Sequence, residues 1–378
     1  MRKTTDRAMK TSRFDKTRAA TATRFTRATI IAASTAIGAA LFGAPPTARA
    51  ADLPKTNLKV IGSISSLPQY KEFEVPFWTK TLAEKSNGAI TADIKGFNEM
   101  GLKGPEVLRL MGQGVVQIGA TVIAYLAADD PANEMIDIAG LLPDVETARK
   151  VTVAARPVLE KLYRDKFGVE LLGIGTYPAQ VLYCNAELTG LADIKGRKVR
   201  AAGRSQSEFI TALGGTPVTM SFGEVVPALQ NKTIDCAITG TISGNLANWH
   251  EVTTHLHRTP LSWGQIAYAA NSKFWAGLDP NVRTLLDTEI KGLERAVWDA
   301  ADNFTRQGYL CNVGDAGCTI GKKGKMKLVE PSAADQALIK KVVNETMLPK
   351  WAARCSADCV EAFNGSVGKV LSLKAVKP

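Results

Sequence analysis

The chain has 378 residues, of which 22% are charged and 45% hydrophobic, and a formal net charge of +11. This charge is unevenly distributed along the chain. Residues 1–50 hold ten Lys and Arg and two Asp, so residues 51–378 hold 37 basic and 34 acidic residues, a net charge of +3. The rest of the chain therefore lacks the basicity of a nucleic-acid-binding protein, and we expect no nucleic-acid partner. Its length is enough for two lobes, each with its own core.

Residues 1–50 have the three parts of a secretory signal peptide. Nine basic residues lie between Arg2 and Arg27, residues 29–43 are apolar and uncharged, and Ala48-Arg49-Ala50 is a small-x-small cleavage site. The apolar stretch is shorter than the ~20 residues that span a bilayer. We predict Sec-type export, cleavage near Ala50 and no stable membrane insertion afterwards; an N-terminal anchor is the alternative. Because the basic segment is long, Met1 and Met9 are both candidate starts.

Six cysteines suit the oxidising compartment to which this segment would direct the chain. Two close pairs, Cys311 with Cys318 and Cys355 with Cys359, predict local disulfides. Metal binding is the alternative, but these cysteines lack a C-x2-C pair and a neighbouring histidine. Cys184 and Cys236 are left over, and we hypothesise that they pair with each other.

The first half of the mature chain alternates between predicted strands and helices. Strands are expected at 58–63, 90–94 and from 117, and helices over about 73–86 and 106–111, each ended by glycine or asparagine. This alternation is typical of an α/β lobe with a largely parallel sheet.

The run from Lys198 to Thr239 repeats strand, turn and helix with clear punctuation. A short strand at 198–201 precedes Ser205-Gln206-Ser207-Glu208, which has the Ser-x-x-Glu spacing of a capping box, and Ser221-Phe222-Gly223-Glu224 repeats that spacing. Pro227 lies inside the second helix, and residues 234–239 form the next strand. Two helices then begin at adjacent strand ends, where their free N–H groups favour an anion. Arg200 and Arg204 lie at the first of these starts, which marks them as anion-binding candidates.

Residues 280–304 predict one long helix. Its apolar positions are spaced by three or four residues, and at 1.5 Å per residue it would run roughly 35 Å, long enough to bridge two lobes. A final helix is expected over about 333–353.

The run ADIKGRKVRAAG…ALGGTPVTMSFGEVVPALQNKTID resembles the core signature of TRAP-transporter substrate-binding proteins of the DctP type. Further matches are Asn87-Gly88, Gly101 followed by PEVLRLMGQGVVQIGA, and LLPDVETARK, so the resemblance covers nearly the whole mature chain.

The resemblance implies a periplasmic receptor of two α/β lobes, each a mixed sheet flanked by helices, that closes over a ligand. Lobe I would comprise 51–177 plus about 263–305, and lobe II 178–262 plus about 306–378. Such receptors bind small organic carboxylates and deliver them to a membrane permease driven by an ion gradient. They are neither enzymes nor cofactor-dependent, so we expect no cofactor.

The resemblance also implies site residues. The family arginine that forms a two-pronged salt bridge to the ligand carboxylate corresponds to Arg200, and a pocket phenylalanine corresponds to Phe222. Where many members have a second arginine and an asparagine, this chain has Gln180 and Thr239. These departures suggest a less polar acid, such as an aromatic or branched monocarboxylate.

Other candidates have equally ordinary interpretations. Arg204 is a second anion contact or an exposed loop charge, and Tyr70, Tyr177 and Trp263 line the cleft or pack in the core. The three histidines match no zinc motif, so we expect no metal site. The rival functions are a receptor of an ATP-driven transporter, a signalling sensor, or a secreted α/β hydrolase, for which the sequence offers no activated nucleophile.

Overall fold

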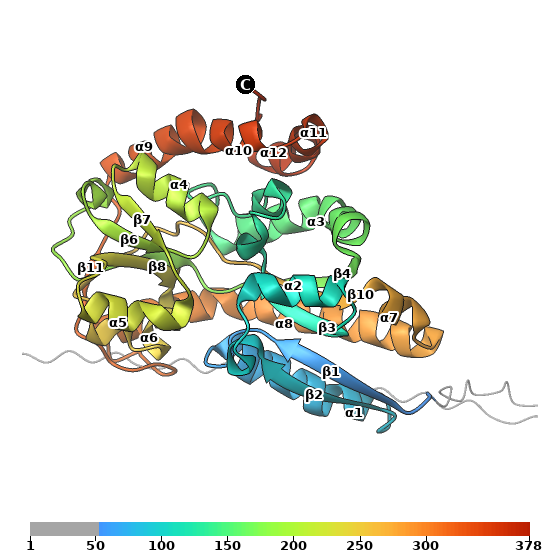
Figure 1. Ribbon diagram of the computed structural model, residues 1–378. Helices are drawn as coiled ribbons and strands as arrows, with labels where there is room; N and C mark the ends of the chain where they lie inside the picture. The colour runs from blue at the N-terminus through green and yellow to red at the C-terminus, as the bar shows by residue number, and fades with distance from the viewer. Residues whose placement is uncertain (1–52) are drawn as a thin grey trace, which may run out of the picture. The chain divides into compact units, whose positions relative to one another are not determined.

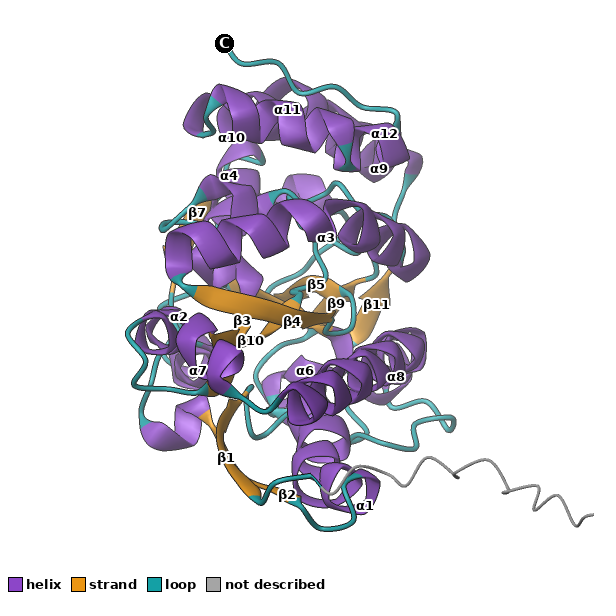
Figure 2. Cartoon of the chain, turned by 90° about the vertical axis from the view of Figure 1, so that its right-hand side faces the viewer, coloured by secondary structure: helices purple, strands orange, loops and turns teal. Residues whose placement is uncertain are grey.

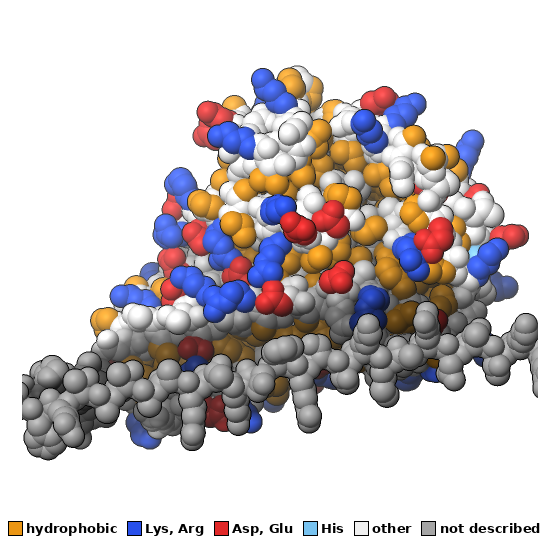
Figure 3. All heavy atoms as spheres, turned by 180° about the vertical axis from the view of Figure 1, so that it is seen from behind, with side chains coloured by type: hydrophobic (Ala, Val, Ile, Leu, Met, Phe, Trp, Pro, Cys, Tyr) orange, Lys and Arg blue, Asp and Glu red, His pale blue; other side chains and the backbone are white. Residues whose placement is uncertain are grey.

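Two separate β-sheets organise residues 53–378, the part of the chain that the computed structural model describes (Figure 1). The predicted signal peptide lies outside the described residues. Within them, no helix is both long and apolar enough to cross a membrane. On the face seen in Figure 3, acidic and basic side chains are interspersed, in keeping with the near balance of charge in residues 51–378.

The first sheet has the strand order β2-β1-β3-β10-β4. Its members, in chain order, are β1 (Thr56–Gly62), β2 (Ile90–Gly96), β3 (Ile118–Val122), β4 (Val169–Gly175) and β10 (Ile266–Asn271). Strand β1 runs parallel to β2 and β3, as the alternation of strands and helices predicts. Strand β10 returns from a distant part of the chain and runs antiparallel between β3 and β4, so the sheet is mixed.

The second sheet has the order β11-β9-β5-β8-β6-β7. Its members are β5 (Gln180–Cys184), β6 (Lys198–Ala201), β7 (Thr216–Thr219), β8 (Cys236–Gly240), β9 (His255–His257) and β11 (Lys327–Val329). Strand β6 is parallel to β7 and β8, while β5 is antiparallel to β8 and β9. Two mixed sheets confirm the predicted fold class; the exact lobe boundaries stay a prediction.

Helices cover both sheets (Figure 2). The α-helices are α1 (Leu82–Lys85), α2 (Gly104–Gly112), α3 (Val145–Phe167), α4 (Arg204–Ala212), α5 (Val225–Gln230), α6 (Thr241–Leu246), α7 (Ser272–Gly277), α8 (Pro280–Val313), α9 (Ala333–Val342), α10 (Leu348–Arg354), α11 (Ala357–Gly365) and α12 (Val367–Leu371). The π-helical turns are η1 (Gln69–Glu74), η2 (Phe77–Thr81) and η9 (Val343–Met347). The 3-10 turns are η3 (Phe97–Met100), η4 (Ile123–Leu126), η5 (Pro131–Glu134), η6 (Leu191–Ile194), η7 (Phe222–Glu224) and η8 (Trp249–Glu251).

Helix α8 is the predicted bridge between the sheets. It begins where the Asp279 carboxylate accepts the N–H of Asn281 at 2.8 Å, and it continues past the predicted end to Val313. One part of α8 packs on β4 of the first sheet, and another part packs on α6, the helix that follows β8 of the second sheet. The fit to α6 is so close that a Cβ on Gly308 would lie 2.3–2.4 Å from the start of that helix. The long apolar face therefore joins both halves of the molecule.

The C-terminal segment contains more helices than the single one predicted over about 333–353. The segment 333–354 is helical, with the π turn η9 between α9 and α10, and it packs on α4 through η9. Helices α11 and α12, which the sequence analysis did not predict, lie against α3 (Figure 2). The C-terminal segment thus contacts helices that flank different sheets.

All six cysteines are paired, as predicted. Cys184 and Cys236 are opposite each other in the antiparallel pair β5/β8, with Cα atoms 4.0 Å apart, so the hypothesised pairing of the two remaining cysteines is confirmed. Cys311 pairs with Cys318 at the end of α8, and Cys355 with Cys359 between α10 and α11.

The first predicted capping box is wrong. Helix α4 begins two residues earlier than a cap at Ser205 predicts, at Arg204 with Gly203 as its cap, so Ser205 lies inside the helix. Its Oγ instead accepts the N–H of Ala139 at 2.8 Å. A Cβ on Gly203 would lie 2.9 Å from the Ala124 carbonyl oxygen, so close approach of another segment decided the cap.

Candidate functional site

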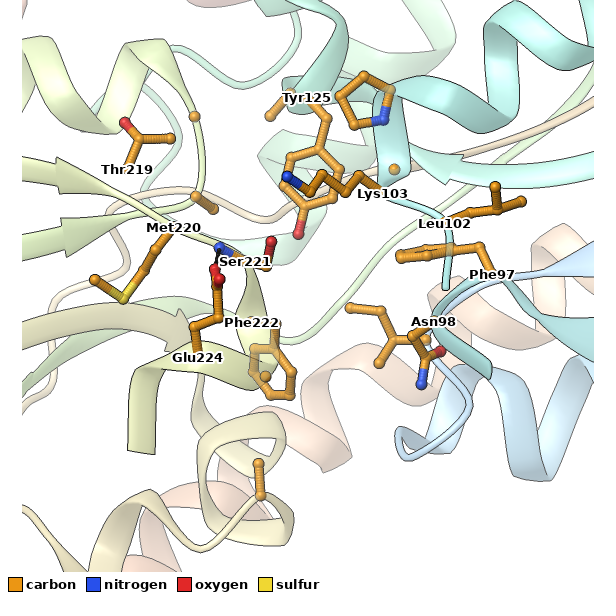
Figure 4. Close-up of a pocket in the computed structure, with 18 of the residues that line it drawn as sticks. Phe97, Asn98, Leu102, Lys103, Tyr125, Thr219, Met220, Ser221, Phe222 and Glu224 are labelled. Atoms are coloured by element: carbon orange, nitrogen blue, oxygen red, sulfur yellow. Dashed lines mark hydrogen bonds between the residues drawn. The ribbon is translucent and has the colours of Figure 1, made fainter. Parts of the chain in front are cut away.

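A cavity of about 1210 Å³ lies between segments that flank the two sheets. Figure 4 shows Lys103 and Tyr125 on one wall and Met220, Ser221, Phe222 and Glu224 on the other. Apolar and aromatic side chains form much of the lining, with a few polar and charged groups among them. Such a lining is typical of a small-molecule site, in which the polar groups orient a ligand.

The first wall comes from loops that follow strands of the first sheet. Ile64 and Ser66 follow β1, and Tyr125 lies in η4, directly after β3. Asn98 fixes the loop after β1, because its Oδ1 accepts the N–H of Ser65 at 2.9 Å. Open α/β sheets present ligand sites at this edge, beyond the carboxyl ends of parallel strands.

Lys103 is a cation that the sequence analysis missed. It caps α2, where its N–H donates to Glu106 at 2.6 Å, and its side chain pairs with no carboxylate of the described chain. In Figure 4 its amine reaches into the space beside Tyr125. One feature of the sequence could have identified Lys103: it precedes Gly104-Pro105, which predicts a helix start. That start lies at the edge of the first sheet where its parallel strands end.

The second wall is formed by the two predicted helix starts. Strands β6 and β7 are parallel neighbours, and the chain after each lines the same cavity, with Gly203, Arg204 and Ser207 after β6 and Ser221–Glu224 after β7. At the second start the Ser221 N–H donates to the Glu224 carboxylate at 2.8 Å, so this Ser-x-x-Glu prediction is confirmed. The short turn η7 and then α5 follow it.

Arg200 lies directly behind this wall, on β6, and is 1% exposed. Its Nε donates to the Met220 carbonyl at 3.2 Å and its Nη1 to the Ile238 carbonyl at 2.8 Å. It has no acidic partner in an ion pair among the residues that the structure describes. Burial lowers the pKa of Arg200, and the neighbouring Tyr125 and Glu224 raise it in turn.

A buried guanidinium without an ion-pair partner is costly, because a charge removed from water needs an opposite charge in contact with it or several polar partners. Two carbonyl dipoles hold Arg200 in place but do not neutralise it. The arrangement is therefore suited to receive an anion from the cavity, and a guanidinium fork matches a carboxylate.

Aromatic side chains surround this position. Phe222 lines the cavity and stacks on Trp249 with ring centres 5.5 Å apart, and its contact with a ligand stays a prediction. The guanidinium carbon of Arg200 lies 5.9 Å from the centre of the Trp249 ring. Trp249 and Tyr125 were not predicted, because nothing in their local sequence separates them from packing aromatics.

Arg204 lines the cavity at its rim, with 55% of its side chain exposed. Its Nε donates to Glu208 at 3.0 Å, one helical turn further along α4. It is therefore both a surface charge and a neighbour of the cavity.

Five other candidates are buried and do not line the cavity in this structure. Gln180 donates to the Pro178 carbonyl at 3.0 Å, Trp263 to Leu142 at 3.2 Å, and Tyr70 to Ile94 at 3.4 Å. The remaining two, Thr239 on β8 and Tyr177 between the sheets, are 4% exposed. A role of these five in ligand binding stays a prediction.

Residues 63–346 match the sequence profile of the DctP family, described as bacterial extracellular solute-binding protein, family 7. The C4-dicarboxylate-binding periplasmic protein DctP of Rhodobacter capsulatus is 30% identical over 228 residues, which are 58% of this chain and 65% of that protein.

Solved structures share the fold. DctP7, a Bordetella pertussis extracytoplasmic solute receptor binding pyroglutamic acid, is 23% identical with a TM-score of 0.72 over 82% of this chain and 98% of its own. A TRAP periplasmic solute-binding protein of Desulfovibrio salexigens with bound orotic acid is 17% identical with a TM-score of 0.73, over 83% and 99%. The family match spans most of the chain and confirms the resemblance seen in its sequence. The protein therefore belongs to the DctP family of bacterial extracellular solute-binding proteins.

Proposed function

We propose that this protein is a periplasmic receptor that binds a small organic carboxylate in the cavity and delivers it to an ion-gradient-driven TRAP permease. The observation that carries the proposal is Arg200, a buried cation directly behind the cavity wall at Met220, without an acidic ion-pair partner in the described chain. Family membership supports the receptor role, and the related structures hold pyroglutamic acid and orotic acid, both small organic acids.

The ligand carboxylate would pair with Arg200 and supply the negative charge that the two carbonyl partners of Arg200 lack. Phe222 and Tyr125 would cover the apolar body of the acid from opposite walls. Closure around the ligand strengthens the ion pair, because excluding water lowers the local dielectric constant.

Two cations of the described chain line the cavity, Arg204 at the helix start after β6 and Lys103 on the wall formed by loops of the first sheet. This refines the expectation of a less polar ligand: an acid with an apolar body and a second polar or anionic group would use both walls. A ligand that contacts both walls also favours the closed arrangement, which the permease would recognise.

A thermal-shift screen with pyroglutamate, orotate, succinate, benzoate and phthalate tests the proposal, because a ligand that binds only the folded state raises Tm. We expect at least one acid to stabilise the protein, and its amide or methyl ester, which lacks the carboxylate charge, to have no effect. Equal stabilisation by the acid and its ester would contradict carboxylate recognition.

A further inference from the structure

Four alternating charges connect the rim of the cavity to a buried carboxylate behind it. Arg204 Nε lies 3.0 Å from Glu208 Oε1, Glu208 Oε2 lies 3.2 Å from Arg354 Nη2, and Arg354 Nη1 lies 2.6 Å from Glu134 Oε2. The last contact is an ion pair whose angles do not make a hydrogen bond. We call these four residues the ionic chain.

The ionic chain joins three elements that are distant in the sequence. Arg204 and Glu208 belong to α4, Arg354 is the last residue of α10, and Glu134 ends η5. Trp351 fixes α10 on η5, because its indole N–H donates to the Pro131 carbonyl at 2.8 Å. Helix α10 is thus placed so that Arg354 lies between the two carboxylates.

Burial increases along the ionic chain away from the cavity. The exposed fraction of the side chain is 55% for Arg204, 16% for both Glu208 and Arg354, and 1% for Glu134. Burial raises the pKa of Glu134, while Arg354 lowers it. Arg354 is therefore the cation that stabilises the buried carboxylate, and it does not itself line the cavity.

Glu208 divides its carboxylate between two arginines, with one oxygen toward each. Without Arg354, both oxygens would be available to Arg204, and the positive charge that Arg204 presents at the rim would be neutralised more completely. The net charge of the four residues would also fall by one.

We propose that Arg354 is a positioning residue for ligand binding, which acts through Glu208 to keep Arg204 available to an anionic ligand. The inference rests on the proposed function, namely that the cavity holds an organic acid. Helix α10 would then influence ligand affinity without contacting the ligand.

The test is a double-mutant cycle in the full mature chain, with the acid that stabilises the wild type most in the screen above as the probe. Arg354→Met should weaken binding about three- to tenfold by isothermal titration calorimetry. In the Arg204→Met background the same substitution should have no further effect on Kd, because the residue through which it acts is gone. Arg354→Lys, which keeps the charge, should restore part of the affinity.

Arg156 offers a matched control. It is 21% exposed, pairs with Glu294 and Glu160 where α3 meets α8, and does not line the cavity. Arg156→Met should lower the unfolding free energy as Arg354→Met does, yet leave Kd unchanged. A general loss of packing would weaken binding in both variants.

Glu208→Gln gives a prediction of opposite sign and keeps the test valid if Arg354→Met does not fold. Removing the charge of Glu208 releases Arg204, so the acid should bind more tightly. A folded Arg354→Met protein with wild-type affinity, an equal loss in the Arg204→Met background, or weaker binding by Glu208→Gln would each overturn the inference. If no acid binds even to the wild type, the proposed function fails instead.

Discussion

Arg200→Met tests the central feature of the proposed site. Methionine keeps an unbranched side chain on β6 but removes the charge and the two hydrogen bonds to Met220 and Ile238. Loss of one member of a buried charge pair weakens binding by about 2 to 5 kcal/mol. This corresponds to an increase in Kd from about 30-fold to several thousandfold.

The effect on stability should be smaller than the effect on binding. Two carbonyls lose their donors, at about 1 to 3 kcal/mol for each buried group left unpaired. Removal of an unneutralised buried charge offsets this cost. The substitution should therefore leave a folded protein whose Tm no longer rises when the acid is added.

Calorimetric titration of wild type, Arg200→Met and Arg200→Lys with the same acid provides the measurement. Lysine keeps the charge but lacks the planar fork, so its affinity should lie between the other two. A folded Arg200→Met protein whose Kd stays within tenfold of the wild-type value would refute the assignment of Arg200 as the carboxylate anchor.

Three further predictions concern stability, each measured by urea unfolding. Burial raises the pKa of Glu74 from 4.5 to about 7, so the folded state holds a proton that the unfolded chain releases, and stability should fall as pH rises from 4.5 to 7. Glu74→Gln should remove about 3 kcal/mol of that fall; identical pH slopes would contradict this. Replacing both Cys184 and Cys236 by Ala should cost about 2 to 4 kcal/mol under oxidising conditions, whereas an unchanged midpoint would show that the disulfide adds no stability. Gly308→Ala should cost about 1 to 3 kcal/mol or more, because its Cβ would overlap the backbone of α6. Gly292→Ala, on the same helix, should instead stabilise, because its Cβ would meet only the end of the Arg295 side chain, at 3.7 Å; equal effects of the two substitutions would refute the close-packing argument.

Features that depend on residues close to one another in the sequence could be predicted from it. The apolar spacing of 280–304 predicted α8 and its bridging position, and the punctuation around Arg200 predicted β6, the second helix start, and the first to within two residues. The family signature then gave an expected role to Arg200 and Phe222. These inferences needed only periodicity, capping chemistry and the rule that parallel strands present their carboxyl ends at one edge.

Features that depend on contacts between distant segments could not be predicted in the same way. The Ser205 cap was wrong because Ala124 and Ala139 approach the start of α4 from elsewhere in the chain. Tyr125, Lys103 and Trp249 join the cavity only when loops of both sheets meet. A local pattern records which backbone groups need partners, but not which distant side chain supplies them.

The sequence by itself thus determined the class of the fold, the position of the buried arginine and the family to which the chain belongs. Only the tertiary structure decided that Arg200 is a buried cation without an ion-pair partner in the described chain, and that Arg204 shares the Glu208 carboxylate with Arg354 of α10. The physical reason is that charge compensation depends on separation in space, and residues 204 and 354 are close only after α10 has packed between η5 and α4.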